Sequence, residues 1–261
     1  MMEPNKLPSE LTLEYFLTAA DTDAQGRMPL WLIVSRLIEG ATLHANALGV
    51  GYADLLPLRM GWVLSRLSIN VVRYPEANEA YTVTTWIDSY NRLYSDRCFL
   101  FADAKGEPVA HVRSMWVAID MDKRTAADLS QLPRERFVVS DRKCPVGRIG
   151  RPQTSGDDAA ARELTWQFCD IDFNRHVNTV QYVRHILNQW DMERYDNHEI
   201  AAFEIAFHHE CHYGDTAVLR HSDLPDGRSL CHITDPQGRC AVAASITWRK
   251  TAAFNETEKK P

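Results

Sequence analysis

The sequence predicts an α+β fold made of two similar halves, each with one hydrophobic helix wrapped by antiparallel strands. A polar turn at residues 21–27 recurs at residues 170–176, with Asp23 and Asp172 in matching places 149 residues apart. Each turn precedes a hydrophobic segment with helical spacing, and several strand-like runs follow each helix. The same order of elements, met twice, indicates an internal repeat.

In the first half, residues 11–17 alternate between apolar and polar side chains, which predicts a strand. Residues 29–48 form the predicted helix, because Pro29 stands near its first position and Gly49 follows its end. The helix is apolar on most sides, so we expect other structure to surround it. Four runs rich in β-branched and aromatic residues follow, at 62–72, 81–89, 94–103 and 108–119.

Residues 120–161 carry Pro, Gly and charge without steady periodicity and predict a connecting segment that is ordered in part. The second half restarts with a strand at 164–169, a polar turn at 170–178 and a helix at 177–190. Further strands are expected at 200–213, 216–222, 229–234 and 241–250. The predicted division is therefore an N-terminal domain at 8–125, a connecting segment at 126–160 and a C-terminal domain at 161–251.

Composition and absent motifs exclude several classes of protein. Lys+Arg 29 against Asp+Glu 35 gives a net charge of −6, which argues against a nucleic-acid partner. No apolar run approaches the roughly 18–20 residues that cross a bilayer, and no secretory signal is evident, so we expect a cytoplasmic protein with no membrane partner. The six cysteines lack a C-x-x-C pair and are expected as free thiols. The G-x-S-x-G, G-x-x-x-x-G-K-[ST], G-x-G-x-x-G and H-E-x-x-H motifs are all missing.

The two polar turns differ in their chemistry. The second holds Asp172, Asn174 and His176, where the first holds Asp23, Gln25 and Arg27. An acid, an amide and an imidazole beside the N-terminus of a helix can move protons and stabilise an oxyanion with the helix amides. The first turn then marks an inactive copy. The alternative interpretation is that Asp172 and Asn174 cap the following helix.

A second candidate feature is the run Phe-His-His-Glu-Cys-His at residues 207–212. In the predicted strand, Glu210 shares a face with His208 and His212, whereas Cys211 lies on the other face. Three interpretations remain open from the residues alone: a solvated strand, a metal site of His208, Glu210 and His212, or Glu210 as a general base. Cys211 as a nucleophile is a further alternative, which the alternation disfavours.

Four segments of this sequence resemble the acyl-ACP thioesterase family of bacteria and plants. DIDFNRHVNTVQYV at residues 170–183 is similar to the family's D-x-D-x-N-x-H-V-N-x-x-x-Y signature, and FEIAFHHEC at 203–211 to its L-x-Y-x-x-E-C strand. WVLSRLSINVVRYP at 62–75 and RLIEGATLHANALGVG at 36–51 are also similar. The resemblance runs from about Tyr15 to Arg249. His208 and His209 stand where the family more often has Arg.

The resemblance implies two tandem hotdog domains, each an antiparallel sheet wrapped around a central helix, in a monomer that mimics a dimer or in a homodimer. It implies hydrolysis of the thioester of fatty acyl-acyl carrier protein in fatty acid biosynthesis, with neither cofactor nor metal. The catalytic residues carried over are Asp172, Asn174, His176 and Glu210, with Glu210 as the base for an attacking water. The partner is acyl carrier protein carrying a fatty acyl chain.

Several points stay open. An acyl-CoA thioesterase, a hotdog hydratase or dehydratase, and a non-catalytic acyl-binding protein are the rival functions. The acyl chain is expected in the N-terminal domain, where Ile38, Leu43, Met60 and Leu64 either line a tunnel or fill the core. An acidic carrier protein would dock on a basic cluster, for which the candidates are Arg142, Lys143, Arg148, Arg151, Arg184 and Arg194.

Overall fold

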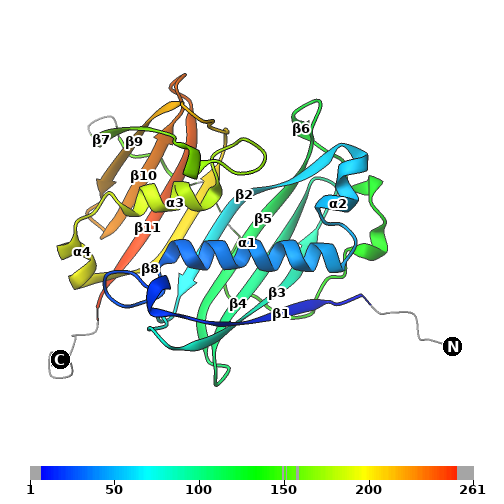
Figure 1. Cartoon of the computed structure of the whole chain (residues 1–261), viewed down its shortest axis with the longest axis horizontal. Coiled ribbons are helices and arrows are strands. Elements are labelled where there is room, and N and C mark those ends of the chain that lie inside the picture. Colours follow the sequence, from blue (N-terminus) through cyan, green and yellow to red (C-terminus); the bar gives the residue numbers. More distant parts are fainter. Residues whose placement is uncertain (1–6, 149, 151, 157–158, 252–261) are drawn as a thin grey trace.

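The chain folds around one large antiparallel sheet. The computed structural model describes residues 7–148, 150, 152–156 and 159–251. Within these residues the strand order is β1-β3-β4-β5-β2-β8-β11-β10-β9-β7, with β6 paired to β5 (Figure 1). The α+β architecture with two similar halves, predicted from the repeat, is confirmed.

The first half follows the predicted elements closely. It contains β1 (Glu10–Phe16), α1 (Leu30–Ala47), a short α2 (Tyr52–Leu55), β2 (Met60–Val71), β3 (Ala80–Tyr90), β4 (Tyr94–Asp103), β5 (Pro108–Asp120) and the two-residue β6 (Thr125–Ala126). Pro29 is the residue before the first turn of α1, and Gly49 has a φ of 68° just after its end. The helix therefore begins and ends where its sequence signals place it.

The second half contains β7 (Ala160–Thr165), α3 (Thr179–Leu187), α4 (Met192–Asn197), β8 (His198–Phe207), β9 (Thr216–Asp223), β10 (Arg228–Thr234) and β11 (Cys240–Lys250). Its first strand lies earlier than the predicted 164–169. The helix predicted over 177–190 is shorter, and α4 is not among the predicted elements. Asp191 explains the break, because its side chain accepts the N–H of Arg194 at 2.9 Å and starts a new helix there.

The two halves meet where β2 pairs with β8, from Arg66 opposite Ala206 to Asn70 opposite Ala202. In Figure 1, α1 and α3 lie in front of the sheet, α1 over the strands of the first half and α3 over those of the second. Leu37 of α1, Ile186 of α3 and Phe203 of β8 belong to one buried cluster that runs through both halves. A shared core therefore fixes the position of one half on the other.

A second buried cluster lies where α1 ends, around Leu48, Leu55 and Phe137. It holds the part of the connecting segment around Leu129, Leu132 and Phe137 against the end of α1. In the described ranges, no helix combines the length and the apolar character that a membrane crossing requires.

Candidate active site

Hydrogen bonds around Asp172 close the turn at residues 170–178. Its carboxylate Oδ1 accepts the backbone N–H of Asn174 at 2.8 Å and that of His176 at 3.2 Å. Its own backbone N–H donates to the carbonyl of His176 at 2.8 Å. These bonds fix a loop from which Asn174 and His176 line the same cavity. One oxygen of Asp172 is thus committed to holding the loop.

The cap of α3 is Asn178, and not Asp172 or Asn174 as the alternative interpretation held. The Asn178 side chain accepts the N–H of Val180 at 2.9 Å. The N–H groups of Val177, Asn178 and Val180 all donate to acceptors of the protein itself. This helix end therefore offers an oxyanion fewer amides than expected.

Strand β8 ends at Phe207, so the prediction of a strand through residue 213 is wrong. The N–H groups of His208 and His209 both point to the carbonyl of Ala241 on β11, at 2.8 and 3.3 Å. Because two successive donors share one acceptor, the chain leaves the regular ladder here. Residues 208–212 form a loop, so their side chains do not alternate between the two faces of a sheet.

This loop lies directly against the loop of Asp172. The N–H of Val177 donates to the carbonyl of Cys211 at 2.9 Å, and His176 forms an isolated antiparallel bridge with His212. These contacts bring Nδ1 of His176 to 3.4 Å from Oε1 of Glu210. Two of the predicted catalytic residues are thus in contact, and Asp172 and Asn174 line the same cavity.

Arg124 is a site residue that the sequence analysis missed. It follows β5 in the turn before β6, and its guanidinium donates to Oε2 of Glu210. The two residues are 86 positions apart and come from different halves, so nothing in the sequence signals their contact. The cation faces the carboxylate oxygen that does not face His176.

The ring of His176 is held in its neutral form. Burial lowers the pKa of His176 below its ordinary value of 6.5, and electrostatic interactions with His212 and Arg124 lower it further. The carboxylate of Asp172 acts in the opposite direction. At neutral pH this ring can therefore hold and orient a neighbour by hydrogen bonding without carrying a charge.

Cys211 is buried, and its side chain has no exposed surface. Burial raises the pKa of the Cys211 thiol, and its backbone N–H donates to the hydroxyl of Tyr182 at 3.2 Å. A buried thiol with a raised pKa is a poor nucleophile. The structure thus disfavours Cys211 through burial, which replaces the alternation argument.

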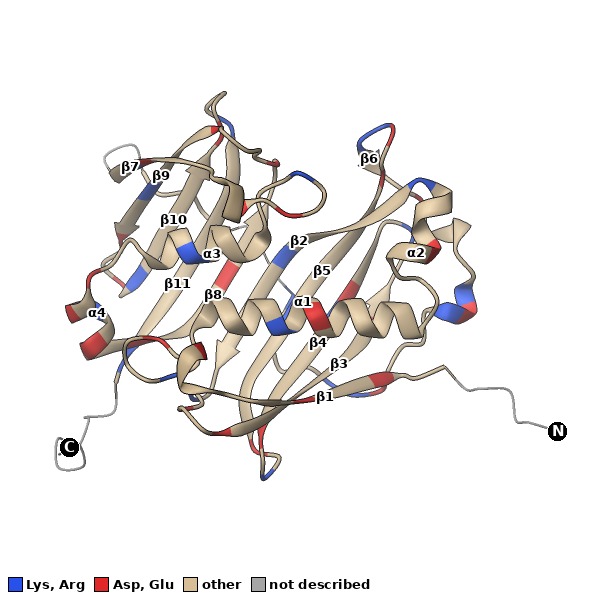
Figure 2. Cartoon of the chain, viewed as in Figure 1, with Lys and Arg blue, Asp and Glu red and all other residues tan. Residues whose placement is uncertain are grey.

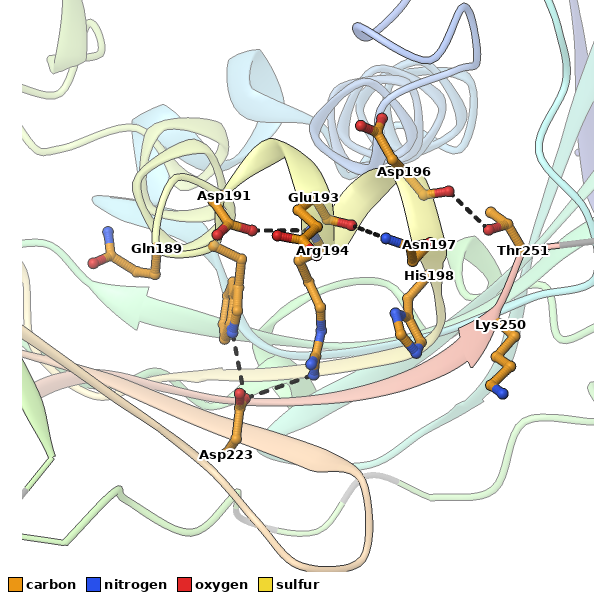
Figure 3. A pocket seen from close by; sticks show the side chains of 11 residues that line it. Gln189, Asp191, Glu193, Arg194, Asp196, Asn197, His198, Asp223, Lys250 and Thr251 are labelled. Carbon is orange, nitrogen blue, oxygen red and sulfur yellow. Dashed lines mark hydrogen bonds and ion pairs between the residues drawn. The ribbon is translucent and has the colours of Figure 1, made fainter. Parts of the chain in front are cut away.

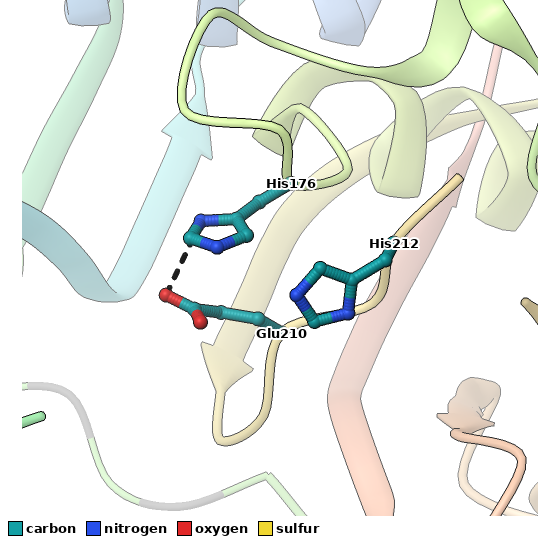
Figure 4. A group of neighbouring side chains, drawn as sticks. All are labelled: His176, Glu210 and His212. Carbon is teal, nitrogen blue, oxygen red and sulfur yellow. Dashed lines mark ion pairs between the residues drawn. The ribbon is translucent and has the colours of Figure 1, made fainter.

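The side chains that could hold a metal differ from the predicted set. His176, Glu210 and His212 each offer a ligand atom within 4.8 Å of the others (Figure 4). His176 takes the place in this group that the sequence analysis gave to His208. The reason is the loop at 208–212, which turns His212 toward the Asp172 loop.

A cavity of about 730 Å³ opens beside these residues and extends into the first half. Its walls come from α1, from β2 to β5 and from the two loops, and apolar side chains predominate. Ile38 and Leu64 line it, as one interpretation expected. Met60 instead belongs to the buried cluster at the end of α1, and Leu43 is 41% exposed.

The wall of the cavity on β4 is polar. Arg97 lines it together with Ser95 and donates to Nδ1 of His44 at 2.7 Å and to Oγ1 of Thr85 at 3.2 Å. Burial lowers the pKa of Arg97 to about 10, so it remains a cation at neutral pH. Strands β5 and β2 lie between β4 and β8, so two strands separate this wall from the strand that leads to Glu210.

The corresponding loop of the first half is bound to the second half by an ion pair and a hydrogen bond. Arg27 stands in the place of His176, and its guanidinium contacts the carboxylate of Glu199 at 2.8 Å. Gln25 donates to Asp196 at 2.9 Å. The expected inactive copy therefore serves as a contact between the halves.

A second depression, of about 820 Å³, lies between α4 and the ends of β9 and β11 (Figure 3). Asp223 is central to it, with Nη2 of Arg194 at 3.7 Å and Nε1 of Trp190 at 3.3 Å. None of the predicted catalytic residues is among its lining residues.

The expected basic cluster does not form one patch. Arg142 lies over the ring of Trp86 on β3, whereas Arg194 lies over Trp248 on β11. Four strands of the sheet separate β3 from β11. Arg151 lies outside the described residues. In Figure 2 the basic positions are dispersed over both halves.

Two family models match the chain, one after the other. The acyl-ACP thioesterase N-terminal domain matches residues 9–133, and the acyl-ACP thioesterase C-terminal domain matches residues 154–250. The chain belongs to the acyl-ACP thioesterase family. The resemblance found in the sequence is confirmed.

Relatives of this acyl-ACP thioesterase family member include plant proteins. This chain is 26% identical to an oleoyl-acyl carrier protein thioesterase of Coriandrum sativum, over 81% of this chain and 62% of that protein. It is 28% identical to a dodecanoyl-[acyl-carrier-protein] hydrolase of Cinnamomum camphora, over 83% of this chain and 62% of that protein. The chain thus spans about three fifths of the length of these curated relatives.

Solved structures of the family share the fold. An acyl-ACP thioesterase from Bacteroides thetaiotaomicron is 26% identical and superposes with a TM-score of 0.87, over 92% of this chain and 98% of that chain. A 12:0-ACP thioesterase from Umbellularia californica gives a TM-score of 0.85 at 20% identity, over 94% and 98%. The predicted pair of hotdog domains is therefore confirmed.

Proposed function

We propose that this protein hydrolyses the thioester of fatty acyl-acyl carrier protein, releasing a free fatty acid and the holo carrier protein. The observation that carries the proposal is the position of Glu210 and His176, in contact with each other at a cavity lined mainly by apolar side chains. Family membership supports the same reaction. A thioester is an activated acyl donor, so a base, a water and oxyanion stabilisation are sufficient for hydrolysis.

In the proposed mechanism, Glu210 accepts a proton from the water whose oxygen attacks the carbonyl carbon. The neutral ring of His176 orients Glu210 from one side, and the guanidinium of Arg124 donates to its Oε2 from the other. The carbon–sulfur bond then breaks, and Glu210 returns the proton to the departing thiolate. One C–O bond forms and one C–S bond breaks, and the proton taken from the water ends on the sulfur of the released thiol.

Asn174 and Asp172 have supporting roles in this proposal. The amide of Asn174 lines the cavity beside His176 and can donate to the developing oxyanion. Asp172 positions both residues through the backbone bonds of their loop. This assignment favours Glu210 over Asp172 as the base, because one oxygen of Asp172 already accepts two backbone N–H groups.

We also propose a division of labour along the chain. Residues 8–125 hold the acyl chain, residues 161–251 carry the catalytic side chains, and 126–160 connect them. The contributions of α1 and β2 to β5 to the cavity support this division. The cytoplasmic location stays a prediction, since the curated relatives above are named as chloroplastic proteins.

The test is fatty acid release by the purified chain from a panel of acyl-ACPs and the matching acyl-CoAs. Glu210→Gln is expected to lower kcat by about 10²–10⁴-fold on every substrate, because the amide cannot take the proton. Glu204→Gln makes the same substitution on β8, away from the cavity, and is the matched control. No release from any thioester would overturn the proposal and favour a dehydratase or a binding protein. If the chain preferred acyl-CoA, thioester hydrolysis would stand and only the proposed carrier of the acyl group would be wrong.

A further inference from the structure

We propose that His176, Glu210 and His212 form a zinc site, and that Zn²⁺ bound there stops the hydrolysis. The inhibition rests on the proposed function, whereas the binding of zinc does not. His212 has no part in the mechanism above, although its ring lies beside Glu210 and 5.1 Å, centroid to centroid, from the ring of His176 (Figure 4). A role for this side chain is therefore still to be assigned.

The distances suit a tetrahedral metal ion. Nδ1 of His176 and Oε1 of Glu210 are 3.4 Å apart. Two ligands at about 2.0–2.2 Å from a tetrahedral zinc ion are separated by roughly 3.4 Å, so this edge of the site already has the required length. The His212 side chain is 55% exposed and can rotate by the small amount that the third bond requires.

Neighbouring groups orient the ligands as they do in zinc proteins. Nδ1 of His212 faces Oδ2 of Asp215 at 3.5 Å, so its other nitrogen, Nε2, is left for a metal. Figure 4 shows the His212 ring directed toward Glu210 and His176. Arg124 donates to Oε2 of Glu210 and leaves Oε1 available. A carboxylate behind a ligating histidine raises its basicity and fixes its orientation.

The donor set favours zinc over the abundant ions Mg²⁺ and Ca²⁺. Two imidazoles and one carboxylate are a recognised three-ligand set for Zn²⁺ with an open fourth position. Mg²⁺ and Ca²⁺ prefer oxygen ligands and are expected to bind weakly here. Three protein ligands leave the fourth position of a tetrahedral ion to water.

Zinc at this position interferes with each proton transfer of the proposed mechanism. The Oε1 lone pair of Glu210 would be bound to the metal and could not accept a proton from water. The ring of His176 would also be held by the metal and could no longer orient the base. Hydrolysis and zinc binding therefore exclude each other.

Zinc binding is measured first, by equilibrium dialysis of the full chain against ZnCl₂ without a thiol reductant or a thioester. His212→Gln is expected to weaken binding at least about tenfold, and Asp215→Asn by about 10–100-fold through loss of the orienting carboxylate. His209→Gln, in the same loop, is the matched control and should bind as the wild type does. Equal binding by wild type and His212→Gln would overturn the site and point to an exposed thiol such as Cys169.

The second measurement is fatty acid release at increasing zinc, expressed relative to each variant's own rate without metal. The wild type is expected to lose activity and to recover it with EDTA, whereas His212→Gln should need at least about tenfold more zinc. Activation by zinc, or equal inhibition of both proteins, would overturn the inference. If no thioester is hydrolysed, the proposed function fails, but the dialysis result still decides the site.

Discussion

Asp23 and Asp172, 149 residues apart, build their loops with the same hydrogen bonds. Oδ1 of Asp23 accepts the N–H groups of Gln25 at 3.0 Å and Arg27 at 2.9 Å. Oδ1 of Asp172 accepts those of the residues two and four positions later, at 2.8 and 3.2 Å. In both loops the aspartate N–H donates at 2.8 Å to the carbonyl of the fourth residue.

The backbone between these bonds also agrees. Gly26 has a φ of 75°, and Arg175 in the matching position has a φ of 67°. Residues other than Gly adopt this left-handed conformation only at a cost in conformational free energy. The loop is thus the same device in both halves. The two loops differ in the side chains that they carry, because Asn174 and His176 of the second stand where the first has Gln25 and Arg27.

Replacement of the two aspartates by alanine should separate structure from catalysis. Asp23→Ala and Asp172→Ala each remove an acceptor for two backbone N–H groups, and each is expected to lower the free energy of unfolding by about 0.5–2 kcal/mol. Only Asp172→Ala should also lower kcat, because its loop carries Asn174 and His176. Urea unfolding and fatty acid release measure the two effects.

Asp172→Asn sharpens this test. The amide retains the Oδ1 acceptor and should recover most of the activity that Asp172→Ala loses. If Asp172→Asn were as inactive as Glu210→Gln, Asp172 would be the base and the assignment given above would be wrong.

Cys211→Ala is expected to keep kcat within about tenfold of the wild type. The thiol is buried, and its raised pKa makes the thiolate rare. The substitution should instead lower the free energy of unfolding, since the smaller side chain leaves a small void beside Tyr182. Loss of turnover in both Cys211→Ala and Cys211→Ser, with the melting temperature preserved, would support a covalent mechanism.

Ala45→Phe should shorten the range of acyl chains that are hydrolysed. Ala45 lies on α1 and lines the cavity, so a phenyl ring there fills space that a long chain needs. A loss of about 1–3 kcal/mol per excluded methylene predicts at least a tenfold fall in kcat/KM for the longest substrates. Leu43→Phe, two residues earlier but 41% exposed, is the control and should change nothing. Equal effects of both substitutions on every chain length would argue against the cavity as the acyl site.

The stability of the protein should fall in acid because of His44. Burial, with the nearby Arg97 cation, lowers the pKa of His44 from 6.5 to about 4. The folded state therefore holds the neutral ring, and the unfolded state takes up a proton below pH 6.5. The contribution of His44 to the free energy of unfolding is therefore complete above pH 6.5 and is lost as the pH falls toward 4. The loss amounts to about 2 kcal/mol between pH 7.5 and pH 5.

His44→Gln, which keeps an acceptor for Arg97, tests this origin. Urea unfolding at pH 7.5 and at pH 5 should show a smaller loss of stability for the variant than for the wild type. The same pH dependence in both proteins would assign the acid sensitivity to other groups.

Local signals in the sequence predicted the repeat, α1 and most strands well. The alternation of apolar and polar residues in the strands and the helix boundaries at Pro29 and Gly49 depend on neighbours along the chain. They can therefore be predicted without knowledge of the fold. Where a contact with a distant strand overrode a local pattern, the prediction failed. The alternating pattern continued beyond Phe207, but the shared acceptor on Ala241 ended the strand there.

The sequence by itself determined the family, the two-domain fold and the four residues expected at the site. These depend on residue order and spacing, which the chain carries explicitly. Only the tertiary structure decided which side chains meet. The contact of Glu210 with Arg124, the exchange of His208 for His176 in the metal-ligand group, and the polar wall at Arg97 all arise between distant elements. Such contacts depend on how the sheet and the loops pack, and no local pattern encodes them.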